Sequence, residues 1–162
     1  GLLIAITSAQ KYVYIQSPYL LPTEPILLAL KTAAAAGVDV RIMIPEKSDS
    51  RMVHWGTMSY LQELMEAGIK IYMYQKGFLH SKLIVCDDCL SSVGSTNMDF
   101  RSFEHNFEIN AFMYDKTSAL MLKDIFLSDQ KDAKLLHLKE WRMRPWSQKV
   151  KESVIRLFAP LL

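Results

Sequence analysis

The sequence predicts an α/β domain with a mixed, largely parallel sheet that is flanked by helices on both faces. Half of its 162 residues are hydrophobic and 22% are charged, which is enough apolar side chain for a buried core. In the first half, β-branched and aromatic runs alternate with segments of helical spacing. In the second half, two apolar runs close together indicate a hairpin. No repeat or linker divides residues 1–162, so we expect a single domain.

The first half alternates strands and helices in the order expected of parallel crossovers. Residues 1–10 are expected to contain the end of a helix. Thr23 is a candidate N-cap, with Pro25 in the first turn of a helix that ends after the alanine run. A further helix spans 51–67 and stops at the C′ glycine Gly68. The strands of this half are expected at 12–15, 38–44 and 69–74.

The second half changes to hairpin-like strands followed by helices. The two strands of the hairpin are separated only by the Asp-Asp-Cys sequence at 87–89. The C-terminal segment carries apolar residues at helical spacing, and we expect it to pack back onto the domain. The expected strands are 79–86, 90–93 and 107–114, and the expected helices lie within 117–126 and 141–162.

Composition excludes several classes of protein. The net charge of +2 does not support a nucleic-acid binder dominated by charge. Two cysteines cannot form a disulfide framework for a chain of this length, and no run of 18 apolar residues is present. The sequence begins with Gly1 and enters an apolar stretch directly, without a signal peptide. We therefore interpret it as a piece of a longer protein, whose membrane segments it does not reveal.

The most informative residues are His80 and Lys82. On a strand, side chains alternate between faces, so these two share one face with the apolar Ile84. A lysine on an otherwise apolar face needs a negative partner, because a buried unpaired charge is costly. The sequence therefore predicts that either a carboxylate or an anionic ligand lies opposite the pair.

A second polar group follows the hairpin in the sequence Gly94-Ser95-Thr96-Asn97. Small residues allow the backbone to approach a ligand closely, and Ser95 and Asn97 supply neutral hydrogen-bonding groups. Together with an imidazole and an ammonium group they suit an oxyanion such as phosphate. Glu108 on the next expected strand could fix the tautomer of a histidine by accepting from one ring nitrogen.

The pattern His80-x-Lys82-x4-Asp87-x6-Gly94-Ser95-x-Asn97 resembles the His-Lys-Asp signature of the phospholipase D superfamily in residue types and spacing. The surrounding sequence narrows the resemblance to the C-terminal half of bacterial cardiolipin synthases, over essentially the whole chain. One departure is His105, where that family is expected to carry an apolar residue. The segments that carry the narrower resemblance are 16–19, 77–82, 97–103, 106–108 and 160–162.

The resemblance implies a chemistry for these residues. Enzymes of this superfamily bring two such motifs together, from two similar halves or from a homodimer. One histidine forms a phosphohistidine, and the other protonates the leaving alcohol and then deprotonates the acceptor. By this resemblance His80 is catalytic, Lys82 and Asn97 bind phosphate, Ser95 is a further candidate ligand, and Glu108 orients His80. Lysine charge replaces a metal ion, so neither a metal nor another cofactor is expected.

The resemblance also implies a function for the parent protein. It would transfer a phosphatidyl group between two phosphatidylglycerol molecules and release glycerol, at the bacterial inner membrane through parts absent from this chain. Its partners would be the phospholipid, the membrane surface, and a second motif from the N-terminal half or a homodimer mate, but no nucleic acid. Alternatives are a homodimeric phosphodiesterase or nuclease and an inert interaction half. The chain by itself is expected to turn over little lipid, since half of the acid–base pair is missing.

Asp87 belongs to the motif but falls on the face opposite His80 and Lys82. The resemblance includes Asp87 among the catalytic residues. Its position near a strand end instead predicts a structural role, such as capping the hairpin. Its replacement is therefore expected to lower the stability of the fold more than the activity of the folded protein.

Other reactive side chains have simpler explanations. Cys86 and Cys89 have the spacing of half a zinc site or a redox pair, but without a second pair packing is favoured. The other histidines, 54, 105 and 137, are expected at the surface, although His54 beside Trp55 could line a cleft. The C-terminal basic residues are expected to form a solvated helix face or, alternatively, to contact anionic lipid headgroups; with the interleaved tryptophans they are Lys139, Trp141, Arg142, Arg144, Trp146 and Lys149.

Overall fold

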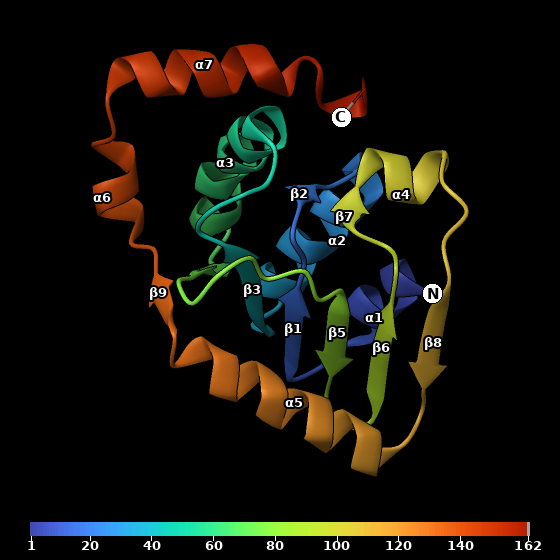
Figure 1. Ribbon diagram of the computed structural model, residues 1–162. Helices are drawn as coiled ribbons and strands as arrows, with labels where there is room; N and C mark the ends of the chain where they lie inside the picture. Colours follow the sequence, from blue (N-terminus) through green and yellow to red (C-terminus); the bar gives the residue numbers. More distant parts are fainter. Residues whose placement is uncertain (162) are drawn as a thin grey trace.

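The computed structural model describes residues 1–161 and confirms the mixed α/β class. A seven-stranded sheet has the order β8-β6-β5-β1-β3-β4-β9, and β2 and β7 form a separate parallel pair (Figure 1). The strands are β1 Tyr12–Gln16, β2 Leu20–Leu21, β3 Asp39–Pro45, β4 Lys70–Tyr74, β5 Leu83–Cys86, β6 Leu90–Gly94, β7 Met98–Asp99, β8 Asn110–Met113 and β9 Ala133–Leu135.

Helices cover both faces of the sheet, as predicted. The buried side chains form two cores, one between the sheet and α1, α2 and α3, and one between the sheet and α5. In Figure 1, α5 crosses the face of the sheet opposite α1 and α2, and α6 and α7 continue past α3. The helices are α1 Leu2–Ser8, α2 Glu24–Ala35, α3 Arg51–Glu66, α4 Phe100–Glu104, α5 Lys116–Gln130, α6 Leu138–Arg142, α7 Trp146–Arg156 and the 3₁₀ helix η1 Ala159–Leu161.

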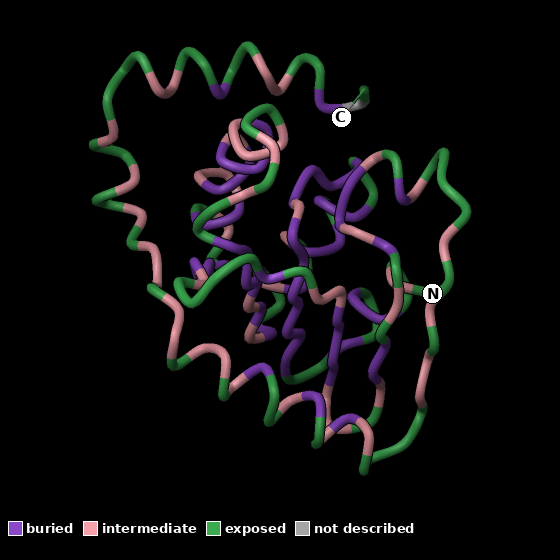
Figure 2. Tube along the Cα trace, in the orientation of Figure 1, coloured by how far each residue is buried: buried purple, intermediate pink, exposed green. Residues whose placement is uncertain are grey.

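The parallel part of the sheet is smaller than the sequence predicts. Only β1, β3 and β4 are parallel to one another, and the other pairings of the seven-stranded sheet are antiparallel. All five residues of β1 are buried, because the strand lies in the middle of the sheet with a core on each face. Figure 2 shows this buried centre surrounded by exposed loops and helices. The central strands therefore supply a rigid base for the loops at their ends.

The predicted helix boundaries agree with the structure at several points. Helix α2 follows Thr23 as predicted, although the threonine side chain makes no capping hydrogen bond. Helix α3 begins after Ser50, whose side chain accepts a hydrogen bond from the Val53 amide. It ends before Gly68, which has a φ of +92° that favours glycine.

Other boundaries in the second half differ from the prediction. The strand expected at 79–86 begins only at Leu83, so residues 79–82 form a loop. The strand expected at 107–114 is shortened to β8, and the expected C-terminal helix is divided by Pro145, which precedes α7. Sequence periodicity did not indicate β2, β7, β9 or α4, because elements of two to five residues are too short to show a period. Of the segments used for the resemblance, residue 162 lies outside the described residues.

No helix within residues 1–161 is long and apolar enough to cross a bilayer.

Candidate active site

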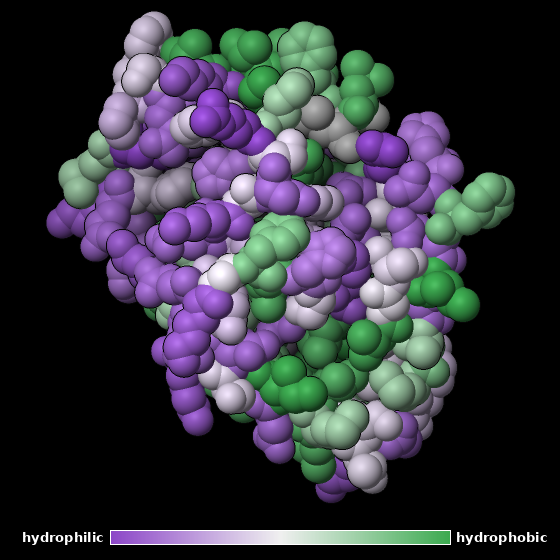
Figure 3. Space-filling model, in the orientation of Figure 1, coloured by the Kyte–Doolittle hydropathy of each residue, from purple (hydrophilic) through white to green (hydrophobic). Residues whose placement is uncertain are grey.

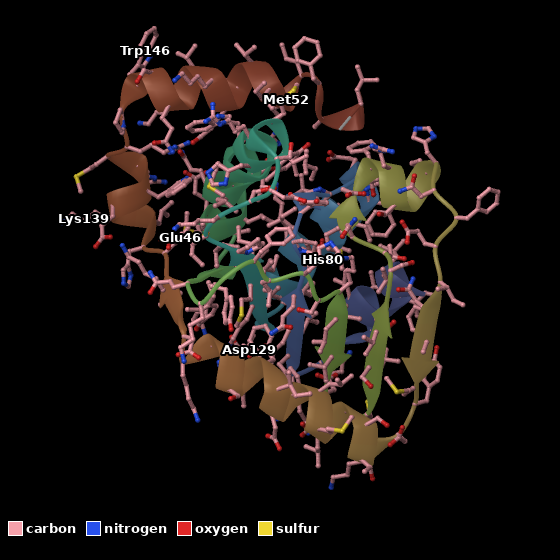
Figure 4. The ribbon with its side chains drawn as sticks, in the orientation of Figure 1. Glu46, Met52, His80, Asp129, Lys139 and Trp146 are labelled. Carbon is pink, nitrogen blue, oxygen red and sulfur yellow. The ribbon has the colours of Figure 1, made fainter. Side chains whose placement is uncertain are left out.

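Three of the predicted site residues, His80, Lys82 and Asn97, gather at one end of the sheet. Strand β1 ends there at Gln16, and the antiparallel strand β5 begins there at Leu83. His80 and Lys82 lie in the loop before β5, and Asn97 lies in the turn between β6 and β7. Figure 4 shows His80 above the start of β5, at the middle of the molecule. Three loops therefore form the site on top of the buried central strands.

His80 and Lys82 lie side by side, as predicted. Lys82 Nζ is 3.2 Å from His80 Nε2 and donates a second hydrogen bond to the His80 carbonyl oxygen at 2.8 Å. An ammonium group can only donate, so in this contact Nε2 is the acceptor. The prediction reached this pairing by strand alternation, which was wrong for both residues because they precede the strand. The loop itself brings the two side chains together.

Lys82 carries a positive charge without an ion-pair partner among residues 1–161. Its side chain is half-buried, and burial lowers its pKa, while the more distant carboxylates of Glu108, Asp99 and Asp49 partly oppose that effect. The sequence predicted either a carboxylate or an anionic ligand opposite Lys82. Among the described residues, no carboxylate is in direct contact with it. An ammonium group arranged in this way favours the approach of an anion.

The loop that carries His80 is fixed by a buried glutamine. Ser81 Oγ donates to Gln16 Oε1 at 2.6 Å, and Gln16 Nε2 donates to Asp129 Oδ2 on α5 at 2.8 Å. Gln16 is only 1% exposed, so both halves of its amide must be paired within the protein. Gln16 was predicted only as part of a resemblance, and its positioning role was not predicted. A polar residue at the end of a fully apolar strand was the available signal.

Asn97 is held by its backbone and not by its side chain. Its amide N–H donates to Ser102 Oγ at 3.2 Å, and the following residue, Met98, donates to Ser17 Oγ at 3.1 Å. The side-chain oxygen of Asn97 is buried and has no hydrogen-bond partner in the described part of the chain. The carboxamide is therefore not committed to holding the turn in place.

Ser95 and Glu108 form a pair of their own. Ser95 Oγ donates to the Glu108 carboxylate and accepts from the Ile109 amide at 3.0 Å, while Asn106 donates to Glu108 at 3.3 Å. The serine hydrogen bond holds the pKa of Glu108 below its usual range. Within residues 1–161 no hydrogen bond joins Glu108 to His80, so the direct orienting contact expected from the sequence is not present. Ser95 binds Glu108 and the backbone of Ile109, which directly precedes β8.

Gly94 has a different purpose from the predicted one. The sequence suggested that a small residue lets a ligand approach the backbone. In the structure Gly94 pairs with Asn110 of β8, and a Cβ atom there would lie 2.7 Å from the Asn110 Cα. The glycine therefore permits close contact between two strands, not contact with a ligand.

Asp87 lies at the far end of β5 from Lys82. Its Oδ2 accepts from the Gln10 amide at 2.6 Å, and its Oδ1 accepts from the Lys11 and Tyr12 amides at 2.8 and 2.9 Å. These three amides precede or begin β1, so the carboxylate ties the hairpin to the start of the central strand. The contacts agree with a structural role, although they fix the neighbouring chain and not the hairpin turn itself.

The remaining candidates also have clear environments. Cys86 is buried and its thiol donates to the Ala5 carbonyl oxygen at 3.5 Å, which confirms packing for this residue, whereas Cys89 is exposed. His54 is half-buried, and burial lowers its pKa despite the nearby carboxylate of Glu152. With Trp55 it lines a hollow of about 750 Å³, so its expected position in a cleft is confirmed. The other two histidines, 105 and 137, are exposed as expected.

The C-terminal basic residues are partly engaged within the protein. Arg144 forms a buried ion pair with Glu152 at 2.8 Å, and Arg142 pairs with Glu66 at 2.8 Å. Lys149 donates to the Arg142 carbonyl oxygen at 2.6 Å. Neither expectation holds for Arg144: it is not solvated, and it is not free to contact a lipid headgroup.

A family model described as "Cardiolipin synthase, PLD-like domain" matches residues 2–130. The chain belongs to this family. The cardiolipin synthase of Geobacillus sp. (strain WCH70) is 51% identical over 157 residues, which cover 97% of this chain and 31% of that protein. For cardiolipin synthase 1 of Staphylococcus epidermidis (strain RP62A) the identity is 49%, and the match covers 97% of this chain and 32% of that protein. The chain thus spans about a third of the length of these relatives.

Solved structures show the same fold at low sequence identity. The phospholipase D family member Nuc from Salmonella typhimurium has a TM-score of 0.71 and 24% identity, covering 83% of this chain and 88% of that one. Phosphatidylserine synthase from Haemophilus influenzae Rd KW20 has a TM-score of 0.77 and 17% identity, covering 99% of this chain and 44% of that one. The cardiolipin synthase PLD-like domain therefore shares its architecture with the wider phospholipase D fold.

Proposed function

We propose that this chain supplies one of two histidine–lysine halves of a cardiolipin synthase. The enzyme would convert two phosphatidylglycerol molecules to cardiolipin and glycerol. The observation that carries the proposal is the imidazole of His80 beside a lysine ammonium group that has no ion-pair partner among the described residues. Such a pair combines a nucleophile or proton donor with a charge that stabilises a phosphate oxyanion.

The proposed reaction has two balanced steps. In the first, a histidine nitrogen attacks the phosphorus of one phosphatidylglycerol, the bond to the glycerol oxygen breaks, and a second histidine gives that oxygen a proton. In the second, the second histidine takes a proton from the hydroxyl of another phosphatidylglycerol, whose oxygen attacks the phosphohistidine and frees the ring. His80 acts as one of these two histidines.

The other residues of this half have supporting roles in the proposal. Lys82 neutralises the phosphate oxygens, and the uncommitted amide of Asn97 hydrogen-bonds to them. Ser95 and Glu108 shape the turn beside Asn97, and Asp87 holds the sheet together. The reaction needs no metal, because the lysines provide the positive charge. The second half comes from another part of a longer chain or from a homodimer mate.

The proposal is tested in a longer chain that joins this sequence to a second His-x-Lys half. We expect cardiolipin to form from phosphatidylglycerol labelled with phosphorus-32 in detergent micelles, as followed by thin-layer chromatography. His80→Ala and Lys82→Ala each lower the rate by about a hundredfold or more, since each removes a group that acts on the transition state. His137→Ala is the matched control, because this exposed histidine lies outside the site.

A parallel arm with labelled single-stranded DNA tests the nuclease alternative. Release of nucleotides together with no conversion of phosphatidylglycerol would overturn the proposal in favour of a phosphodiesterase. Full lipid transfer by the His80→Ala variant would also overturn it. The 162-residue chain without a second motif is expected to turn over little lipid, and robust synthesis by a strict monomer would contradict the two-histidine scheme.

A further inference from the structure

Helix α7 presents an apolar face to the outside of the molecule. Trp146, Val154 and Leu157 are 78%, 49% and 79% exposed, and Val150 lies between them on the same side of the helix. Figure 3 shows hydrophobic side chains along the upper edge of the molecule, where Figure 1 places α7, and Figure 4 shows Trp146 at that edge. The opposite side of α7 is anchored to the domain through Arg144, which pairs with Glu152 of α7 and donates a hydrogen bond to Gln62 of α3 at 2.9 Å. A stripe of this kind on an anchored helix marks an interaction surface.

Cations border this apolar face. Lys149 and Lys151 lie on either side of the stripe on α7, as the helical spacing requires. Neither has an ion-pair partner among residues 1–161. Lysine is depleted at the cores of protein–protein interfaces, whereas lysines beside an exposed apolar stripe are typical of helices that lie on a bilayer.

A basic hollow continues from the stripe. The hollow of about 750 Å³ is lined by the N-terminal end of α3, the segment after β3 and Lys151 of α7. Its cations Lys47, Arg51 and Lys151 face a single carboxylate, Glu46, and none of the four is in an ion pair in the described part of the chain. The excess of positive charge matches an anionic headgroup.

An apolar groove shares two residues with the hollow. Trp55 and Lys151 line both, and the groove of about 260 Å³ is completed by Val150, Val154 and Ile155 of α7. The Lys151 ammonium lies 5.7 Å from the centre of the Trp55 ring, so the two residues mark the boundary between charged and apolar surface. A phospholipid has the same arrangement of charged and apolar parts, because its charged headgroup is directly followed by hydrocarbon.

The segment after β3, which lines the hollow, continues toward the candidate active site. The same segment continues to Asp49, whose carboxylate accepts from the Tyr19 hydroxyl at 2.8 Å. Burial and this carboxylate raise the pKa of Tyr19 to about 12, so the hydroxyl stays protonated and keeps the contact. Tyr19 follows the end of β1 at Gln16, where the loops of the candidate site lie. A lipid bound at the hollow therefore lies on the side of the molecule where the site residues gather.

We propose that the α7 corner binds the surface of an anionic phospholipid bilayer. The α7 corner comprises the outer face of α7 and the hollow between Lys47 and Lys151. The apolar stripe enters the interface of the bilayer, and the cations of the hollow hold the phosphate of one headgroup. The inference deepens the proposed function and rests on it for the choice of a lipid as partner. It assigns the membrane contact to Lys47, Arg51 and Lys151, not to Arg142 and Arg144.

The test is flotation of the 162-residue chain with vesicles of phosphatidylcholine alone and of phosphatidylcholine with 30% phosphatidylglycerol. We expect binding to the anionic vesicles only. The double variant Lys47→Gln/Lys151→Gln lowers the partition coefficient by about 25-fold, from about fivefold for each cation near an anionic surface. Leu157→Gln lowers it by about tenfold, because less apolar area enters the interface. These side chains are exposed, so both variants are expected to retain the wild-type unfolding temperature.

Matched variants at other surfaces serve as controls. Lys116→Gln/Lys134→Gln makes the same change of charge, and Met121→Gln makes the same kind of polar change at an apolar residue of α5 that is 57% exposed. Binding is expected to be unchanged in both. Equal loss in the controls, equal binding to vesicles without phosphatidylglycerol, or no effect of the α7-corner variants would overturn the inference. Equal binding to neutral vesicles would show that the anionic headgroup is not recognised, and no effect of the α7-corner variants would favour a protein segment as the partner of α7.

The binding assay separates this inference from the proposed function. It contains no transfer step, so the His80→Ala variant is expected to bind the anionic vesicles as the wild type does. Binding without any lipid transfer in the two-half protein would refute the proposed function alone. Normal transfer with α7-corner variants that bind undiminished would refute this inference alone.

Discussion

The clearest test of the role of Asp87 is the substitution Asp87→Asn. The aspartate accepts three backbone hydrogen bonds at 2.6, 2.8 and 2.9 Å, from Gln10, Lys11 and Tyr12. Asparagine keeps one oxygen but places an amide NH₂ group opposite the Gln10 N–H, so one charge-assisted bond is lost and the other two lose their charge. The φ of Asp87 is +53°, a conformation that asparagine also tolerates, so no backbone strain is added.

The expected loss of unfolding free energy follows from these bonds. One lost bond to a charged acceptor and two weakened ones amount to about 2–3 kcal/mol. For a chain of 162 residues each kcal/mol lowers the melting temperature by about 2–4 °C, which gives a shift of about 4–12 °C. The measurement is urea unfolding followed by circular dichroism. Asp124→Asn is the matched control, because Asp124 is exposed and is expected to change stability by less than about 0.5 kcal/mol.

The same variant is expected to keep its chemistry at a temperature where it stays folded. Five residues of extended chain place Asp87 about 16 Å from Lys82, too far for contact with the reacting phosphate. Lipid transfer by the folded two-half protein should therefore fall by less than about threefold, since only indirect effects remain. An Asp87→Asn protein with wild-type stability and abolished transfer would refute the structural role and return Asp87 to the catalytic residues.

Three further outcomes are expected. Gln16→Leu leaves Ser81 and the α5 carboxylate without their hydrogen-bond partner. It should destabilise the protein by about 1–3 kcal/mol in urea unfolding and lower the rate of transfer by the folded enzyme. An unchanged rate would contradict the positioning role. Gly94→Ala forces β6 and β8 apart and should cost about 1–3 kcal/mol; equal stability would show that the strands adjust freely. Burial would raise the pKa of Asp39, but hydrogen bonds from Arg41 and Lys70 lower it below its usual range. This stability is present above the ordinary carboxyl pKa of about 3.9 and is lost as the pH falls through the lower folded value. Asp39→Asn should therefore reduce the unfolding free energy at pH 7, and its effect should shrink as the pH falls through that value.

Much of the candidate site was predictable from local sequence. The spacing of His80, Lys82 and Asn97 identified the motif, and the structure places His80 and Lys82 in contact and Asn97 in a turn at the same end of the sheet. Strand alternation did not place His80 and Lys82 correctly, because the strand does not extend back to residue 79. Strand β5 pairs with β1 only from Gln16 to Val13, so the partner strand, not the propensity of residues 79–82, sets where β5 begins.

The hydrogen bonds that position the site were not predictable in the same way. Gln16 bonds to an aspartate 113 residues away, and Asp87 bonds to amides 75 to 77 residues away. Nothing in the local spacing connects such residues, because their proximity depends on which strands become neighbours. The partner of Glu108 was not predictable either: within residues 1–161 its carboxylate accepts hydrogen bonds from Ser95 and Asn106 and none from His80.

The sequence by itself determined the class of fold, the main helices and central strands, and the motif that places the chain in its family. These features depend on hydrophobic period, end signals and residue spacing, which all act over a few turns or strands. Only the tertiary structure decided that most strand pairs are antiparallel, that Lys82 has no carboxylate in contact within residues 1–161, and that the outer face of α7 is left exposed beside a basic hollow. Those features depend on which surfaces meet when distant segments pack, and a linear pattern does not specify that choice.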